Sequence, residues 1–159
     1  MPYYVRVFCK SNKIPTVDEV FNFANSQSYN FKLEVVENTL DETETNWTSF
    51  EMKYKDDKGP IVVELSMVDD KDEIGKEEIK EFLEEIGSPG LSLKKRKVIN
   101  HLKGTKYIVA NQLLGDIDDD GYDANGEFLK FFVDNFEGMQ HADGEGFYDK
   151  DMTILVADK

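Results

Sequence analysis

The sequence predicts an α+β fold with a mixed, largely antiparallel sheet and helices packed on one face of it. The chain has 159 residues, 40% of them hydrophobic and 12% aromatic, which is enough to bury one sizeable core. Strand-like segments follow one another as hairpins and are also separated by helices. Helical periodicity is bounded by capping residues at several places. We therefore expect residues 1–159 to form a single globular domain.

The first half of the chain contains one predicted helix among predicted strands. Aromatic and β-branched residues at positions 3–9 are typical of a central strand. Thr16 and Glu19 form a capping box ahead of apolar residues spaced i, i+3, i+4 and i+7, which predicts a helix over residues 17–26. Three strand-like segments follow, and the last two form a hairpin: residues 31–35, 47–54 and 61–68.

The second half of the chain contains three predicted helices. An apolar stripe at helical spacing ends at Gly87, where a glycine favours helix termination, and Pro89 lies just beyond. Ser92 caps a third helix that stops at Gly104. The remaining elements are a buried strand at 107–114, a helix that begins near Glu127 and ends near Gly138, and a closing hairpin arm at 147–156. This order, β-α-β-β-β-α-α-β-α-β-β, is compatible with two ferredoxin-like halves.

The charge of the chain limits the classes of partner. The formal net charge is -14, and residues 105–159 carry thirteen acidic residues against four lysines. An acidic surface repels nucleic acid and anionic membranes, and it attracts metal ions or a basic protein surface. We therefore expect neither a nucleic-acid partner nor a membrane partner. The sequence gives no indication of an oligomeric state.

No segment predicts a membrane span or a secretory signal. The apolar runs are shorter than the roughly 18 residues that a span needs, and residues 1–10 lack a charged segment followed by an apolar one. Cys9 is the only cysteine, so an intramolecular disulfide is excluded, and its apolar neighbours indicate a buried thiol. We expect a cytoplasmic protein.

Residues 116–127 carry the clearest chemical signal in the chain. The pattern D-x-D-x-D-G is followed, after five residues, by a glutamate. It resembles the twelve-residue calcium-binding loop of EF-hand proteins. The resemblance implies a site for calcium rather than magnesium, with side-chain ligands and one backbone carbonyl, that of Tyr122. The five implied ligands are Asp116, Asp118, Asp120, Tyr122 and Glu127.

The resemblance covers these twelve residues only. Asp123 stands where an EF-hand loop carries an aliphatic residue, residues 107–114 are predicted as a strand rather than an entering helix, and the chain has no second such loop. An alternative is an acidic connection between a strand and a helix, in which Asp123 or Asn125 caps the helix and the other carboxylates favour its positive end.

Three functional hypotheses follow from the sequence. The first is a non-enzymatic protein in which calcium has a structural or weakly regulatory role. The second is an acidic interaction protein, of the inhibitor or immunity type, that docks on a basic partner. The third is a metal-dependent hydrolase that combines the acidic loop with His141, Asp143 and Glu145, since alternate residues of an extended strand share a face. The common nucleophile and phosphate-binding motifs are absent, so the sequence favours a non-enzymatic role over the hydrolase.

Overall fold

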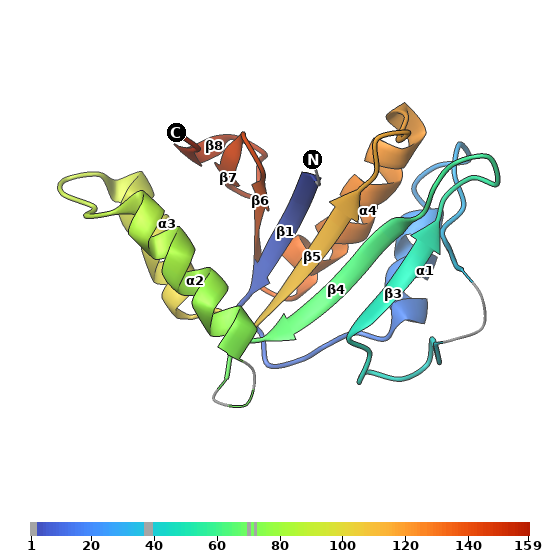
Figure 1. Cartoon of the computed structure of the whole chain (residues 1–159), viewed down its shortest axis with the longest axis horizontal. Helices are drawn as coiled ribbons and strands as arrows, with labels where there is room; N and C mark the ends of the chain where they lie inside the picture. The colour runs from blue at the N-terminus through green and yellow to red at the C-terminus, as the bar shows by residue number, and fades with distance from the viewer. Residues whose placement is uncertain (1–2, 37–39, 70, 72) are drawn as a thin grey trace.

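A computed structural model describes residues 3–36, 40–69, 71 and 73–159. Eight strands form one sheet in the order β2-β3-β4-β5-β1-β6-β7-β8. Figure 1 shows β3, β4, β5, β1 and β6 side by side. The strands are β1 (Tyr3–Cys9), β2 (Glu34–Val35), β3 (Ser49–Lys53), β4 (Ile61–Met67), β5 (Tyr107–Leu113), β6 (Gly138–Ala142), β7 (Gly146–Tyr148) and β8 (Ile154–Ala157). The helices are α1 (Val17–Asn25), α2 (Glu73–Ile86), α3 (Leu93–Lys103) and α4 (Asp119–Asn135). The α+β class is confirmed.

Local capping signals correctly located three of the four helices. The Thr16 hydroxyl accepts a hydrogen bond from the Glu19 amide at 3.1 Å, at the start of α1. The Ser92 hydroxyl accepts one from the Lys95 amide at 3.2 Å, at the start of α3. Gly87 follows α2 with a φ of +72°, a left-handed conformation that a glycine adopts without strain. Each helix therefore has a terminus that is determined by residues within one turn of it.

Two predicted boundaries and one predicted number of strands were wrong. The segment 31–35 pairs as a strand only at β2, because the Asn25 side chain accepts from the Leu33 amide at 2.7 Å and donates to the Leu33 carbonyl at 3.1 Å. These bonds satisfy backbone groups that a strand partner would otherwise satisfy. The helix α4 begins at Asp119 rather than near Glu127. Three strands follow it where two were expected.

The arrangement of strands and helices also differs from the prediction. Each neighbouring pair of strands is antiparallel, so the sheet is not mixed. The strands β4 and β5 separate β1 from β3, so the chain does not form two ferredoxin-like halves. No helix in the described ranges is long and apolar enough to cross a membrane.

Helices cover both faces of the sheet, and the expectation of a single covered face was wrong. Val7 and Phe8 are adjacent in β1, so they face opposite sides, yet both are fully buried. Val7 belongs to the larger core, which lies under α1 and α4 and includes Phe128. Phe8 belongs to a smaller core under α2 and α3, which includes Val98. A strand that is buried on both faces needs apolar residues in succession, as β1 has.

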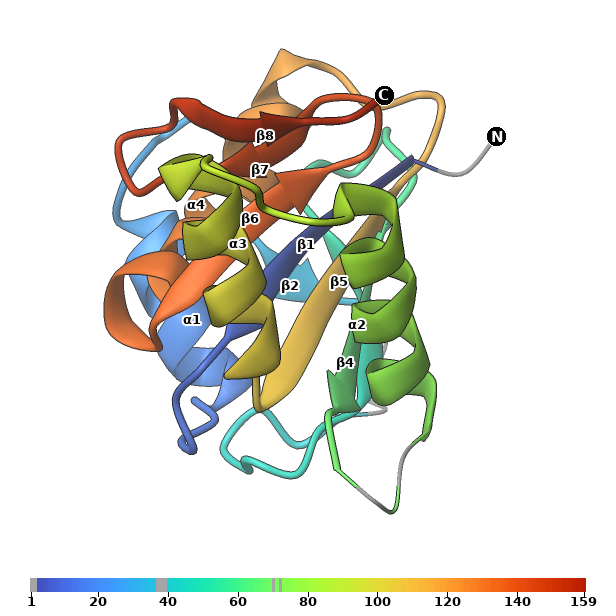
Figure 2. The same ribbon diagram turned by 90° about the vertical axis from the view of Figure 1, so that its left-hand side faces the viewer.

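The two helix layers cover the sheet to different extents. Figure 2 shows α2 and α3 in front of the sheet, and Figure 1 shows α2 diverging from it after a start beside the end of β4. The smaller core joins α2 and α3 to β1, β5, β6 and β7. On the same side, Glu64 of β4 is exposed, and Ser66 of β4 and Ala110 of β5 are only half-buried. This side of the sheet is therefore partly open.

Candidate functional site: an acidic groove beside α2

The aspartates of the implied calcium loop contact other parts of the protein. Asp118 caps α4, since its Oδ1 accepts a hydrogen bond from the Gly121 amide at 3.0 Å. The Lys55 ammonium lies 3.0 Å from Asp118 Oδ2 and also forms an ion pair with Asp120. Asp116 Oδ2 accepts from the Gly59 amide at 2.8 Å. Hydrogen bonds from Lys55 and Gly121 hold the pKa of Asp118 below its usual value.

The other two implied ligands lie within α4. Tyr122 is in its first turns, where a carbonyl points along the helix toward the residue four positions on, and its side chain is 52% exposed. Glu127 lies further along α4, and its Oε2 is buried without a hydrogen-bond partner. Within the described residues, no group of three or more His, Cys, Asp or Glu side chains has a metal-binding arrangement. Calcium binding here stays a prediction that would require Lys55 to leave the aspartates and the start of α4 to unwind.

Of the three residues His141, Asp143 and Glu145, the first two lie close together and Glu145 lies apart from them. Gly144 has a φ of +77° and turns the chain between β6 and β7. Glu145 accepts hydrogen bonds from the Tyr3 and Tyr148 hydroxyls, while His141 packs against Phe82 on the α2 side of the sheet. The hydrogen bonds from Tyr148 and Tyr3 lower the pKa of Glu145. The trio proposed for a hydrolase is therefore divided between the two faces.

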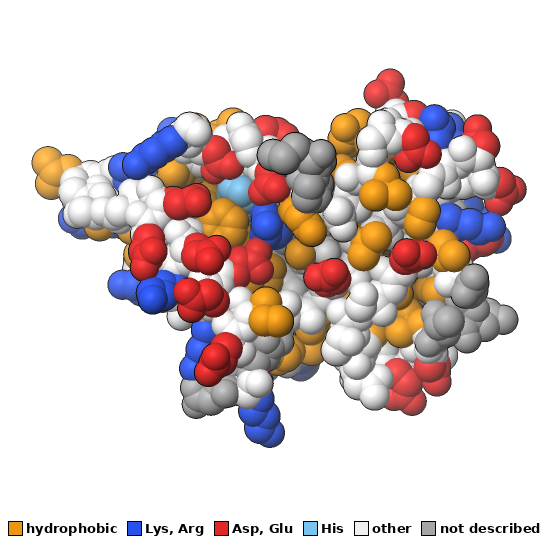
Figure 3. Space-filling model, in the orientation of Figure 1, with side chains coloured by type: hydrophobic (Ala, Val, Ile, Leu, Met, Phe, Trp, Pro, Cys, Tyr) orange, Lys and Arg blue, Asp and Glu red, His pale blue; other side chains and the backbone are white. Residues whose placement is uncertain are grey.

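The open side of the sheet forms a hollow of about 690 Å³ beside α2. Its walls are α2 and the face of β1, β4 and β5, and its inner end is β6 with the segment after β8. Figure 3 shows acidic side chains gathered over α2 and around this hollow. We call it the acidic groove. Its carboxylates fall into a paired group (Glu78, Asp143 and Asp158) and an unpaired group (Glu64, Glu77, Glu81 and Glu85).

Arg6 is the one arginine or lysine among the described residues that line the groove. Its guanidinium forms ion pairs with Glu78 and, at 2.7 Å, with Asp143. The same group lies 5.0 Å from the centre of the Tyr4 ring and 5.4 Å from that of Phe82. Arg6 thus shows that a cation is held here by carboxylates together with aromatic faces.

His141 closes the inner end of the groove. It is 1% exposed, and its ring lies between Phe82 and Phe147, at centroid distances of 4.7 and 4.6 Å. Its Nε2 is 2.9 Å from Asp158 Oδ1. The other ring nitrogen, Nδ1, has no hydrogen-bond partner and lies 4.0 Å from Asp143 Oδ1.

The unpaired glutamates form a stripe along α2. Glu77, Glu81 and Glu85 are four residues apart, so they lie on one side of the helix at intervals of about 6 Å. All three are exposed, as is Glu64 across the groove on β4. None of the four has a cationic partner in the part of the chain that the structure describes. Like charges at this spacing repel one another, and a bound cation would relieve that repulsion.

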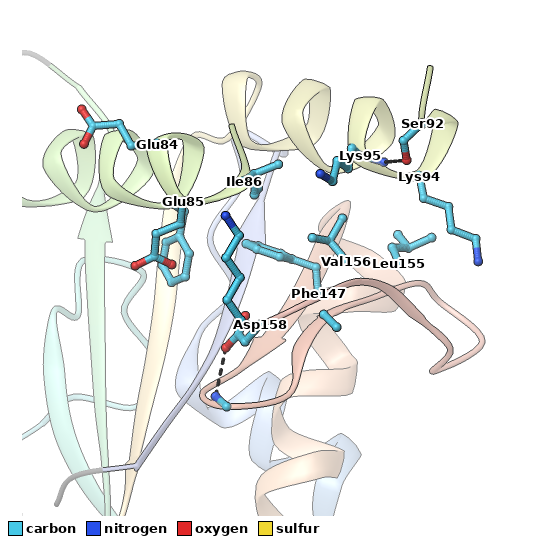
Figure 4. Close-up of a pocket in the computed structure, with 14 residues that line it drawn as sticks. Glu84, Glu85, Ile86, Ser92, Lys94, Lys95, Phe147, Leu155, Val156 and Asp158 are labelled. Atoms are coloured by element: carbon cyan, nitrogen blue, oxygen red, sulfur yellow. Dashed lines mark hydrogen bonds between the residues drawn. The ribbon is translucent and has the colours of Figure 1, made fainter. Parts of the chain in front are cut away.

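A second hollow of about 770 Å³ adjoins the acidic groove and shares Glu85 and Asp158 with it. Figure 4 shows Phe147, Leu155 and Val156 on the strand side of this hollow, facing α3. Lys95 and Lys94 are on the α3 side. The surface therefore changes along the length of α2 from acidic to a mixture of apolar side chains and charges of both signs.

Apart from His141 and Asp143, the residues of the groove were not identified from the sequence. The spacing of Glu77, Glu81 and Glu85 places them on one helical face. That face can be identified as a binding surface only when the position of α2 against β4 is known. Arg6 and Asp158 have no local motif, since their partners lie far away in the chain.

Comparisons with family models, with curated proteins and with solved structures found no match for the chain. The chemistry of the acidic groove therefore provides the argument for function.

Proposed function

We propose that the protein binds a basic protein partner through the acidic groove. The observation that carries this proposal is the stripe of Glu77, Glu81 and Glu85, which faces Glu64 across an open sheet face and has no cationic partner among the described residues. This is the behaviour of an inhibitor or immunity-type protein, which occupies a basic surface of its partner. Residues 105–159 carry thirteen of the acidic residues, but only two of these, Asp143 and Asp158, line the groove.

The geometry of the stripe favours a protein partner. Carboxylates about 6 Å apart match lysines or arginines at i, i+4 and i+8 of a helix, and also alternate residues of an extended strand. The adjoining apolar hollow offers a place for a hydrophobic side chain of the same partner. A net charge of -14 would increase the rate of encounter with a basic surface, and salt would reduce that effect.

The test compares two variants with the same change in charge. Glu77→Gln, Glu81→Gln and Glu85→Gln together neutralise the stripe, while Asp57→Asn, Asp123→Asn and Asp134→Asn neutralise three exposed carboxylates outside the groove. Each immobilised protein is exposed to a lysate of its source at low and at high salt. A basic protein captured at low salt is then purified, and its affinity for each variant is measured.

We expect the stripe variant to bind at least about tenfold more weakly than the wild type, since each close charge pair at an interface contributes about 1.5 kcal/mol or more. The matched variant should retain most of the affinity. Equal losses in the two variants would show that only net charge matters. Capture of no basic protein at low salt would reject the proposal.

A further inference from the structure

We propose that His141 and Asp143 form a subsite, at the inner end of the acidic groove, for one cationic nitrogen of a lysine or arginine side chain. The subsite rests on the proposed function and specifies its chemistry, since it defines what the basic partner inserts. Three observations support it: the unpartnered ring nitrogen of His141, the position of Asp143 beside that nitrogen, and the carboxylate and aromatic contacts of Arg6.

The contacts of His141 leave one of its ring nitrogens without a partner among the described residues. Asp158 is a hydrogen-bond acceptor, so the Nε2 that faces it at 2.9 Å carries the hydrogen. In the neutral imidazole, Nδ1 is then a bare acceptor. The rings of Phe82 and Phe147 pack on the imidazole and hold its orientation. A buried acceptor without a partner is rare in proteins and unfavourable, so Nδ1 is suited to a donor from outside the chain.

The position of Asp143 completes a pair of acceptors. Its Oδ1 lies 4.0 Å from His141 Nδ1, which is too long for a hydrogen bond between the two groups. One nitrogen that carries two or more hydrogens could lie within about 2.9 Å of each acceptor and donate to both. The Asp143 side chain is 37% exposed, so the pair is accessible from the groove through movement of this side chain.

Arg6 shows that the surroundings of the subsite accept a cation. Its guanidinium bonds to Asp143 Oδ1 at 2.7 Å and lies over the Tyr4 and Phe82 rings. A carboxylate oxygen has more than one lone pair, so Asp143 can bind Arg6 and an incoming nitrogen together. The stripe on α2 leads from solvent toward this point. A partner side chain would thus remain beside carboxylates along its path.

The experiment uses ten-residue oligo-lysine and oligo-arginine peptides at low salt. The wild-type protein is labelled with ¹⁵N in its histidine rings, and each peptide is titrated while the imidazole resonances are followed. Binding in the subsite should move the Nδ1 resonance of His141. The resonances of His101, whose Nε2 bonds to the Phe8 carbonyl at 2.7 Å, are an internal control and should not move. The peptide that causes the larger shift identifies which side chain the subsite prefers.

The matched variants are Asp143→Asn and Asp149→Asn. Asp143→Asn should weaken peptide binding about tenfold, the loss typical of one hydrogen bond to a charged group. Asp149 pairs with Lys97 outside the groove, so its variant should bind as the wild type does. Because the wild-type titration needs no substitution at the buried His141, the test does not depend on the folding of a His141 variant.

The outcomes separate the subsite from the proposed function. Peptide binding that moves Nδ1 of His141 and weakens in Asp143→Asn supports the subsite. Peptide binding that depends on the α2 stripe, but leaves Nδ1 unmoved and is unchanged in Asp143→Asn, overturns the subsite and leaves the proposed function standing. Failure of both peptides to bind at low salt counts against both.

Discussion

The acidic residues at the start of α4 and those along α2 differ in what they contact. Asp116, Asp118 and Asp120 are each bound by a group of the same chain, through the Gly59 and Gly121 amides and the Lys55 ammonium. The glutamates of the α2 stripe face an open side of the sheet and lack a cationic partner within the described residues. The three aspartates of the first region are therefore bound within the chain. The glutamates of the second region are spaced further apart and are free to bind a partner.

This difference shows that the density of carboxylates in a sequence does not indicate which of them are free to bind. At the start of α4, carboxylates cap a helix and attach it to the turn between β3 and β4. Along α2, similar groups lie beside the part of the sheet face that α2 and α3 leave open. The α4 side should therefore govern stability, and the α2 side should govern binding.

The largest expected effect comes from the core beneath α4. Phe128 is fully buried and contacts the Phe21 and Phe50 rings, so Phe128→Ala should lower the free energy of unfolding by about 3–5 kcal/mol. Phe82→Ala, on the margin of the groove, should cost less because that side chain is only half-buried. Urea unfolding monitored by circular dichroism measures both. Similar losses would contradict a division between a stabilising face and a binding face.

A smaller effect is expected from calcium. If residues 116–127 bind the ion, Lys55 competes with it for Asp118 and Asp120, so Lys55→Met should bind calcium more tightly than the wild type. At a hundredfold excess over the dissociation constant, the thermal midpoint of Lys55→Met should rise by roughly 5–10 °C. The measurement uses chelator-treated protein with calcium, with magnesium and with neither, and Asp118→Ala is the control that should not respond. Three coincident curves for Lys55→Met would reject the calcium site.

The smallest effect concerns acid stability at the start of α4. The pKa of Asp118 is lower in the folded protein than its usual value, because Lys55 and the Gly121 amide donate to it. Its contribution to stability is thus fully present above the unfolded pKa of about 3.9 and is lost as the pH falls through the folded value. Asparagine caps a helix about as well as aspartate does, so Asp118→Asn should lower the thermal midpoint at neutral pH by about 2 °C or less, through loss of the ion pair with Lys55, and reduce its further fall in acid.

Thermal midpoints of the variants at pH 7 and at acid pH test whether the ion pair between Lys55 and Asp118 causes the pH dependence. Lys55→Met should also reduce the acid-dependent loss, and adding Asp118→Asn to it should change the pH profile less than Asp118→Asn does in the wild type. Independent effects of the two substitutions would show that the ion pair does not cause the pH dependence.

The features that were predicted correctly from the sequence depend on short-range interactions. Thr16 bonds to an amide three residues away, Ser92 does the same, and Gly87 adopts its left-handed conformation where a helix ends. Such contacts depend on neighbouring residues, so a pattern of a few positions contains them. The central position of β1 was also predicted, because aromatic and β-branched residues such as those at positions 3–9 are typical of a central strand.

The features that were missed depend on contacts between distant segments. Gly121 is the glycine of the D-x-D-x-D-G pattern, and a Cβ at that position would lie 2.6 Å from the Tyr54 ring. The glycine therefore allows Tyr54 to pack against the first turn of α4. The acidic groove likewise exists only because α2 diverges from β4 and β5. No local pattern around Glu77 or Arg6 specifies that geometry.

The place of β1 between β5 and β6 has a consequence for synthesis of the chain. β1 precedes the other strands, but both of its partners lie beyond residue 106. Until they emerge from the ribosome, Val5, Val7 and Phe8 have no strand partners, and α4, which covers the Val7 side of the sheet, is also absent. Pairing of such distant segments is slow, on a scale of milliseconds to seconds. Nascent-chain chaperones should therefore bind at this first strand, because its apolar residues stay unpaired until β5 and β6 have been synthesised.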